Sequence, residues 1–155
     1  MKQAAVMMLM AVLTAGCTES AVDCGELAQD KSVGNAGCLV VAQDALAMVQ
    51  QRRDDSWSIP GGTAESGERA ACTAARETRE ETGLNVRPVK LLQVLDNGFH
   101  IYWCENVGDV AMQPRDRLEI RDVAWKRADE RGGLVWRFPA EQPLVEALIE
   151  ANTPH

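Results

Sequence analysis

The sequence has few of the residues on which zinc sites and nucleic-acid-binding surfaces depend. Histidine occurs only at His100 and His155, and no two cysteines have the C-x2-C spacing of a zinc ligand pair. A zinc site is therefore not expected. Lys and Arg number 16 against 23 Asp and Glu, which gives a net charge of −7. An acidic surface repels a phosphate backbone, so the composition argues against a nucleic-acid polymer as partner.

The apolar run at the start of the sequence is too short to span a membrane, which takes roughly 20 residues. It extends from Ala4 to Ala15, with Lys2 as the only charge before it. This pattern predicts a signal peptide over residues 1–16 and export to the periplasm of a bacterial envelope. The ending Leu13-Thr14-Ala15-Gly16-Cys17 resembles a lipobox, which implies a lipidated Cys17 and membrane attachment. Simple cleavage of the signal peptide is the alternative.

Four cysteines follow Cys17, and an exported protein meets an oxidising compartment in which disulfides form. Four cysteines allow three pairings. We expect Cys24–Cys38, which would tie an N-terminal arm to the first strand, and Cys72–Cys104, which would tie a helix to the sheet beneath it. Buried, unpaired thiols are the alternative.

The rest of the sequence predicts an arm or linker over residues 17–35 and a single domain over residues 36–150. Apolar runs predict strands at residues 38–41, 46–49, 86–95, 99–104 and 118–125. Hairpin turns are expected at Gln43-Asp44 and Asp96-Asn97-Gly98, and an amphipathic helix from Pro143. This order of elements predicts an α/β fold, a mixed β-sheet with helices on its faces.

A further helix is predicted from Gly67 to Thr82, and its charges are unusual. Glu77, Glu80 and Glu81 stand at positions i, i+3 and i+4, which share one helix face. A hard divalent cation such as Mg2+ or Mn2+ would neutralise them, because it prefers carboxylate oxygens. A salt-bridged surface helix is the other interpretation. A separate stripe of small residues is expected to pack on the sheet: Ala71, Ala75, Thr78 and Thr82.

The segment from Gly62 to Leu84 resembles the Nudix box, G-x5-E-x7-R-E-U-x-E-E-x-G-U, in which U is a bulky aliphatic residue. All the fixed positions match: Gly62, Glu68, Arg76, Glu77, Glu80, Glu81 and Gly83. Leu84 fits the last U, whereas Thr78 stands where an aliphatic residue is usual. The resemblance implies a Nudix-like α/β/α sandwich with a mixed sheet. It also implies hydrolysis of a nucleoside diphosphate linked to another moiety, or of a related small-molecule diphosphate.

The resemblance assigns roles to the acidic residues as well. The implied metal ligands are Glu68, Glu77, Glu80 and Glu81. Bound cations would neutralise charge on the phosphoryl oxygens and lower the pKa of a bound water, and a carboxylate would then take the proton. Glu80, Glu81 and Glu119 are the candidates for that base, and the sequence does not decide among them. Arg76 is expected to orient a ligand.

Substrate contacts are expected outside the acidic helix. The Gly61–Gly62 pair permits φ > 0 and lets the backbone approach a phosphate. Arg52 lies in a charged loop where it would meet phosphate, and Tyr102 stands where some dinucleoside-polyphosphate hydrolases carry a tyrosine. Aromatic residues that would stack on a base, or else lie in the core, are Trp57, Phe99, Trp103 and Trp136.

Two other classes of protein would also fit parts of this sequence. One is a non-catalytic module of the cell envelope that keeps the Nudix fold and senses a nucleotide-like ligand. The other is a structural lipoprotein. Neither needs all the box acids, and all of them are present here.

Overall fold

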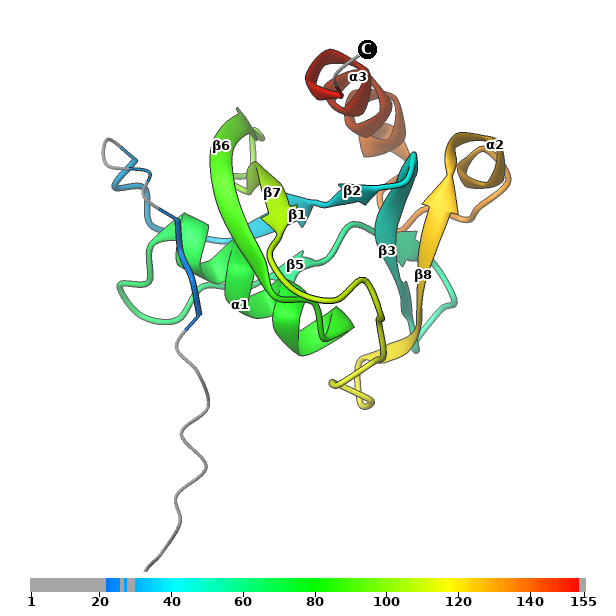
Figure 1. The fold of residues 1–155 in the computed structure, drawn as a ribbon, viewed down its shortest axis with the longest axis horizontal. Helices are drawn as coiled ribbons and strands as arrows, with labels where there is room; N and C mark the ends of the chain where they lie inside the picture. Colours follow the sequence, from blue (N-terminus) through cyan, green and yellow to red (C-terminus); the bar gives the residue numbers. More distant parts are fainter. Residues whose placement is uncertain (1–21, 26, 28–29, 154–155) are drawn as a thin grey trace, which may run out of the picture.

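The computed structural model describes residues 22–153, except residues 26 and 28–29 (Figure 1). The predicted signal peptide and Cys17 lie outside the described residues. The elements in chain order are β1 (Ala36–Leu39), β2 (Val41–Ala42), β3 (Ala45–Gln51), β4 (Trp57–Ser58), β5 (Gly61–Gly62), α1 (Ala70–Thr82), β6 (Val86–Val94), β7 (His100–Asn106), β8 (Ile120–Arg127), α2 (Ala128–Arg131), the 3-10 turn η1 (Pro139–Glu141) and α3 (Gln142–Asn152). Within the described part of the chain, no helix combines the length and apolarity needed to cross a membrane.

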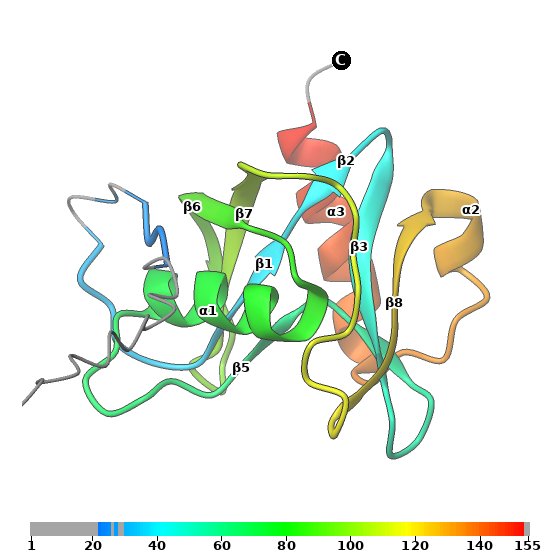
Figure 2. The same ribbon diagram turned by 60° about the horizontal axis from the view of Figure 1, so that its bottom comes forward.

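The strands form two four-stranded sheets that the chain joins where β1 leads into β2 (Figures 1 and 2). The first sheet has the order β5-β1-β7-β6, in which β1 and β7 are parallel and the other pairs antiparallel. In the second sheet β3 pairs with β2, β4 and β8, all antiparallel. The α/β class with a mixed sheet is as expected, although the sheet is divided in two.

Helices α1 and α3 cover opposite faces of this layer, as an α/β/α sandwich requires (Figure 2). The small stripe predicted on α1 is buried against the first sheet: Ala71, Ala75, Thr78 and Thr82. The Thr78 hydroxyl donates a hydrogen bond of 2.7 Å to the Ala74 carbonyl. This bond satisfies the polar group of Thr78 inside the core, which explains how a threonine is accommodated at a position where aliphatic residues are usual.

Both predicted hairpins are present, because their turn residues adopt the conformations that such turns need. Gln43 and Asp44 have φ values of 50° and 61° between β2 and β3. Gly98 has φ 80° in the turn between β6 and β7, where its N–H donates to the Leu95 carbonyl. The closing helix is also confirmed: α3 has Pro143 in its first turn and buries Val145.

Helix α1 begins at Ala70, three residues later than the Gly67 expected. Gly67 has φ 74° in a turn that precedes the helix. The N-terminal arm contacts the start of the helix: the Ala70 N–H donates to the Ser32 carbonyl, and Val33 forms a bridge with Arg69. The other end is as expected: Gly83 caps α1 in the left-handed conformation, with φ 79°.

The predicted disulfide pairing is wrong. The structure joins Cys24 to Cys72 and Cys38 to Cys104. Because β1 lies parallel to β7 with Cys38 opposite Tyr102, Cys104 is two residues further along the same face. The arm meanwhile passes the first turns of α1, which brings Cys24 within 4.5 Å of Cys72 between Cα atoms. The pairing therefore depends on a strand order that local sequence patterns do not specify.

Candidate active site

Arg76 lies at the centre of the charged face of α1. Its guanidinium donates to both carboxylate oxygens of Glu68 at 2.9 Å, to Glu77 at 3.0 Å and to Glu80 at 3.1 Å. It also donates to the Thr63 carbonyl at 2.9 Å. One arginine thus faces three glutamates, and their negative charge exceeds its own. The expectation that Arg76 orients a ligand is consistent with these contacts, because the arginine holds several candidate ligands at once.

Glu68 is the partner that Arg76 holds most firmly. Besides the two-pronged contact with Arg76, its carboxylate accepts hydrogen bonds from the Thr73 hydroxyl and the Glu65 N–H. The bonds from Arg76 hold the pKa of Glu68 down at about 2. In this arrangement Glu68 fixes the arginine and the turn before α1. A role as metal ligand would require Glu68 to give up some of these bonds.

Glu81 is the most deeply buried of the box glutamates, with 7% of its surface exposed. Its Oε2 accepts a hydrogen bond of 2.8 Å from the Gly61 N–H. Burial raises the pKa of Glu81 to about 8. The hydrogen bond from Gly61 and the charge of Arg137 oppose this rise, and the charges of Glu77 and Glu119 add to it. Burial also raises the pKa of Glu77, an effect that the adjacent Arg76 opposes.

The glycine pair of β5 brings the backbone against these acids. Gly61 has φ 156°, a conformation that favours glycine. A Cβ on Gly62 would lie 2.6 Å from the carboxylate carbon of Glu77. Sequence reasoning predicted that the pair would let the backbone approach a phosphate. The structure shows that this backbone closely approaches the carboxylates of Glu77 and Glu81.

The donor chemistry at this edge fits a hard divalent cation. Glu77 and Glu81 are neighbouring carboxylates whose ionisation is disfavoured by burial. A bound cation would stabilise their charged forms. Glu80 adds a third carboxylate, 53% exposed, on the same helix face. Among the described residues, no group of three Asp, Glu, His or Cys side chains is arranged so that it could hold a metal ion without rearrangement. Arg76 instead lies against Glu77 and Glu80.

A cleft of about 260 Å³ opens beside the glycine pair. It is lined by residues from β4 and β5 and their flanking segments, the residue before β1, the β6–β7 hairpin and the segment before α3: Asn35, Ser58, Ile59, Gly61, Gly62, Thr63, Asn97, Phe99, Arg137, Phe138 and Glu141. Phe99, a predicted candidate for stacking, is among them. Arg137, Phe138 and Glu141 were not identified from the sequence. A cationic residue followed by an aromatic one, as in Arg137-Phe138, is a signal that the sequence offers for a ligand site. The position of this pair, however, depends on the bridge between Trp57 and Trp136.

Two predicted substrate contacts are not in this cleft. Arg52 donates from Nε to the Arg117 carbonyl at 2.9 Å and from Nη2 to the Ile120 carbonyl. Its role is therefore to hold the loop that leads into β8. Tyr102 is fully buried, and its hydroxyl donates to Asp30 in the arm. The structure therefore does not support Tyr102 as a substrate contact, because β7 is an interior strand of its sheet and the side chain lies in the core.

The other predicted residues divide between the core and the neighbourhood of the acids. Trp57 and Trp136 belong to the core on the α3 side. Trp103 is half-buried and packs against the same core. Glu119 is exposed and precedes β8, where a strand position was expected, and its charge acts on Glu81.

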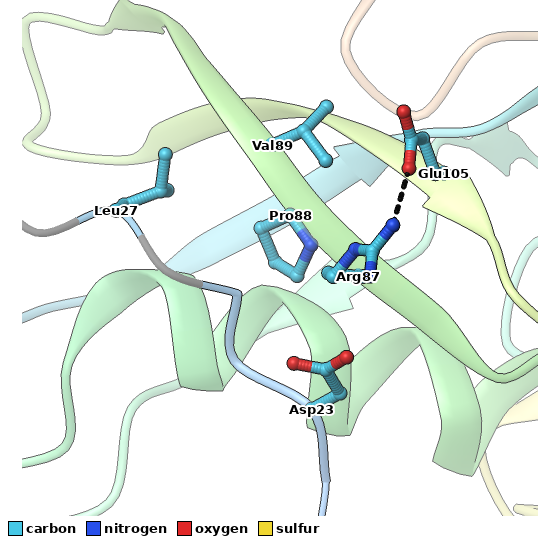
Figure 3. Close-up of a pocket in the computed structure, with 6 residues that line it drawn as sticks. All are labelled: Asp23, Leu27, Arg87, Pro88, Val89 and Glu105. Atoms are coloured by element: carbon cyan, nitrogen blue, oxygen red, sulfur yellow. Dashed lines mark hydrogen bonds and ion pairs between the residues drawn. The ribbon is translucent and has the colours of Figure 1, made fainter.

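A larger pocket, of about 460 Å³, lies apart from the acidic helix face. Figure 3 shows it between the arm, which carries Asp23 and Leu27, and the edge strand β6. Arg87 and Glu105 form an ion pair of 2.8 Å at its side (Figure 3). This pocket contains none of the box residues, so the smaller cleft is the better candidate for a catalytic site.

Comparison with known proteins agrees with the geometry. A family model, described as the NUDIX domain, matches residues 31–145. A CMP-5'-(N-acetyl-N-hydroxy-3-aminopropyl)phosphonate hydrolase of Streptomyces rubellomurinus is 30% identical over 138 residues, which cover 79% of this chain and 66% of that protein. A MutT-like protein of Streptomyces ambofaciens is 31% identical over 104 residues, 64% of this chain and 66% of that protein. This chain thus spans just under two thirds of the length of both relatives.

The fold has counterparts among solved structures. An ADP-ribose pyrophosphatase from Streptococcus suis superposes with a TM-score of 0.64 at 21% identity. The superposition covers 78% of this chain and 92% of the other. At this identity the likeness concerns the fold alone.

Proposed function

This chain belongs to the Nudix family, and on that premise we propose that it is a metal-dependent hydrolase of a small diphosphate substrate. The linkage cleaved is the diphosphate of a nucleoside diphosphate derivative or a related compound. One observation carries the proposal: the carboxylates of Glu77 and Glu81 crowd against the Gly61–Gly62 backbone, and the same two glycines line a cleft. Such crowding is costly for folding, and a site for divalent ions accounts for it.

Glu77, Glu80 and Glu81 would hold the ions, which are Mg2+ or Mn2+. A bound ion supplies charge neutralisation at the phosphoryl oxygens and a more acidic water. The chain's own contribution is to hold the carboxylates in place. Arg76 orients Glu77 and Glu80, and the Gly61 N–H orients Glu81. The proton of the attacking water passes to a carboxylate, for which Glu80, Glu81 and Glu119 remain the candidates.

The substrate lies in the cleft beside the glycine pair. Its phosphates face Gly61 and Gly62, and the rest of the molecule extends towards Phe99 and Phe138. The printed name of the Streptomyces rubellomurinus relative describes hydrolysis of a CMP-linked compound, which supports a nucleotide-like substrate here.

A panel of diphosphates tests this function directly. Purified protein is incubated with Mg2+, with Mn2+ or with a chelator, and phosphate-containing products are measured. We expect turnover that requires the metal ion. Glu80→Gln should lower kcat by at least about a hundredfold, because it removes a ligand charge while keeping the side-chain size.

Glu150→Gln is the matched control, because Glu150 is exposed on α3, the helix that covers the opposite face from α1. It should hydrolyse like the parent. Turnover of Glu80→Gln at the parental rate would contradict the assigned site. Binding of diphosphates without any turnover would instead favour a sensing module.

We also propose that the protein works outside the cytoplasm, attached to a membrane through Cys17. Two observations support this proposal. An apolar run precedes Cys17 in the sequence, and the other four cysteines form two disulfides, which form and persist in an oxidising compartment.

A further inference from the structure

Besides the glycine pair, the lining of the cleft includes two aromatic rings and one acidic side chain. Phe99 comes from the β6–β7 hairpin, and Phe138 and Glu141 come from the turn before α3. Phe138 is 48% exposed, so its ring is accessible to a ligand in the cleft. The aromatic part of the lining is therefore suited to a flat, partly apolar ring.

Glu141 and Phe138 are linked by the local backbone. Phe138 is the N-cap of η1 and Glu141 is its last residue, and the Glu141 N–H donates to the Phe138 carbonyl at 2.9 Å. This turn holds both residues in the lining of the cleft.

The Glu141 carboxyl has no hydrogen-bond or charged partner among the described residues. Burial is the one cause that raises its pKa, and no donor lowers it. The two asparagines of the cleft differ, because their side-chain oxygens already accept backbone N–H groups, Asn35 from Ala64 and Asn97 from Phe99. Glu141 is the acidic side chain of this cleft that is left to meet a ligand.

Arg137 sets the direction in which a nucleotide would lie. Its guanidinium stacks over the Phe138 ring, 5.2 Å from the ring centre. Its charge also acts on Glu81 at the acidic end. A cation between the acids and the ring site suits a phosphate between a metal-bound diphosphate and a stacked base.

We propose that Glu141 recognises the base of the substrate and that this base is guanine. Guanine presents two adjacent donors, N1–H and the 2-amino group, which match the two oxygens of one carboxylate. Adenine and cytosine each place a ring nitrogen acceptor beside their amino group, and that acceptor repels a carboxylate. Phe138 supplies the surface on which the base stacks.

The size of the cleft limits what else the substrate carries. Clefts that enclose drug-sized ligands measure about 300–1,000 Å³. This one, about 260 Å³, has room for one ring system. A guanosine diphosphate joined to a moiety that extends into solvent fits this limit better than a molecule with two enclosed nucleosides.

This inference rests on the proposed function, so its test measures binding without hydrolysis. Calorimetry with GMP, AMP and CMP, in the presence of a chelator, compares the three bases on one phosphate. We expect GMP to bind at least tenfold more tightly than AMP or CMP. Glu141→Gln should reduce that preference to less than threefold, because an amide offers one acceptor and one donor. Glu150→Gln is the control and should keep the preference.

Equal affinities for the three nucleotides in the parent protein, or no measurable binding of GMP, would overturn the proposal. So would a guanine preference that survives in Glu141→Gln. If that variant does not fold, the comparison of nucleotides on the parent still decides. Metal-dependent diphosphate hydrolysis without base preference would leave the proposed function standing and refute only the role of Glu141.

Discussion

The Gly61 N–H donates a hydrogen bond to the buried carboxylate of Glu81, and this bond joins the cleft to the acidic helix. The two residues are 20 positions apart in the sequence. The contact holds Glu81 next to Glu77 in surroundings that disfavour both charges.

The pH dependence of stability should reveal the buried acid in metal-free protein. The pKa of Glu81 is raised from 4.5 to about 8 on folding, so the folded state binds this proton more tightly than the unfolded state does. Unfolding then releases a proton, and stability falls as pH rises from 4.5 to about 8. The slope for one such group is at most about 1.4 kcal/mol per pH unit. Urea denaturation at several pH values, in the presence of a chelator, measures it.

Glu81→Gln should flatten that slope, because glutamine carries no proton to release in this range. Glu150→Gln, on the exposed side of α3, should leave the slope unchanged. If stability in the Glu81→Gln variant still falls with pH as in the parent, another group is responsible.

Gly62→Ala should impair catalysis more than folding. The added Cβ would lie 2.6 Å from the Glu77 carboxylate, which Arg76 holds in place, so Glu77 must move and lose that bond. We expect hydrolysis to fall more than about tenfold, with a loss of stability of about 1–3 kcal/mol. Gly132→Ala is a matched control, since nothing lies within 4 Å of a Cβ there and its φ is −62°. Equal activity of the two variants would show that Gly62 does not position Glu77.

Non-reducing peptide mapping should find Cys24 joined to Cys72 and Cys38 joined to Cys104. Loss of either bond should lower the free energy of unfolding by about 2–4 kcal/mol, as for other disulfides that close long loops. The double variants Cys24→Ser with Cys72→Ser, and Cys38→Ser with Cys104→Ser, measure each bond separately. A peptide that joins Cys24 to Cys38 would contradict this structure.

Cys17→Ser should move the protein from the membrane fraction to the soluble fraction of cells that export it. Cys17 carries the lipid in our proposal, and serine cannot take that modification. Cys24→Ser serves as a control, because Cys24 belongs to a disulfide instead. An unchanged membrane fraction for Cys17→Ser would refute lipid attachment at this position.

Local patterns in the sequence were sufficient to predict much of the fold. The small stripe on α1, the Gly83 cap and both hairpins follow from helical spacing and turn residues, and all are present. The start of α1 was placed too early, because contacts with the arm at Ser32 and Val33 decide where the helix begins.

The remaining features depend on strand order, which local patterns do not specify. The parallel pairing of β1 with β7 places Cys38 beside Cys104 and buries Tyr102. The bridge between Trp57 and Trp136 brings Arg137 and Phe138 to the cleft. Both are contacts between segments far apart in the chain. The acids of the candidate site could be found from their spacing, whereas the residues around the ligand could not.

Calorimetric titration of the purified protein with Mn2+ tests whether the acidic face of α1 binds divalent ions. We expect saturable uptake by the parent and by Glu150→Gln, and at least about tenfold weaker binding by Glu81→Gln and by Glu77→Gln. Absence of uptake by the parent, with and without a diphosphate present, would contradict a metal site on this helix face.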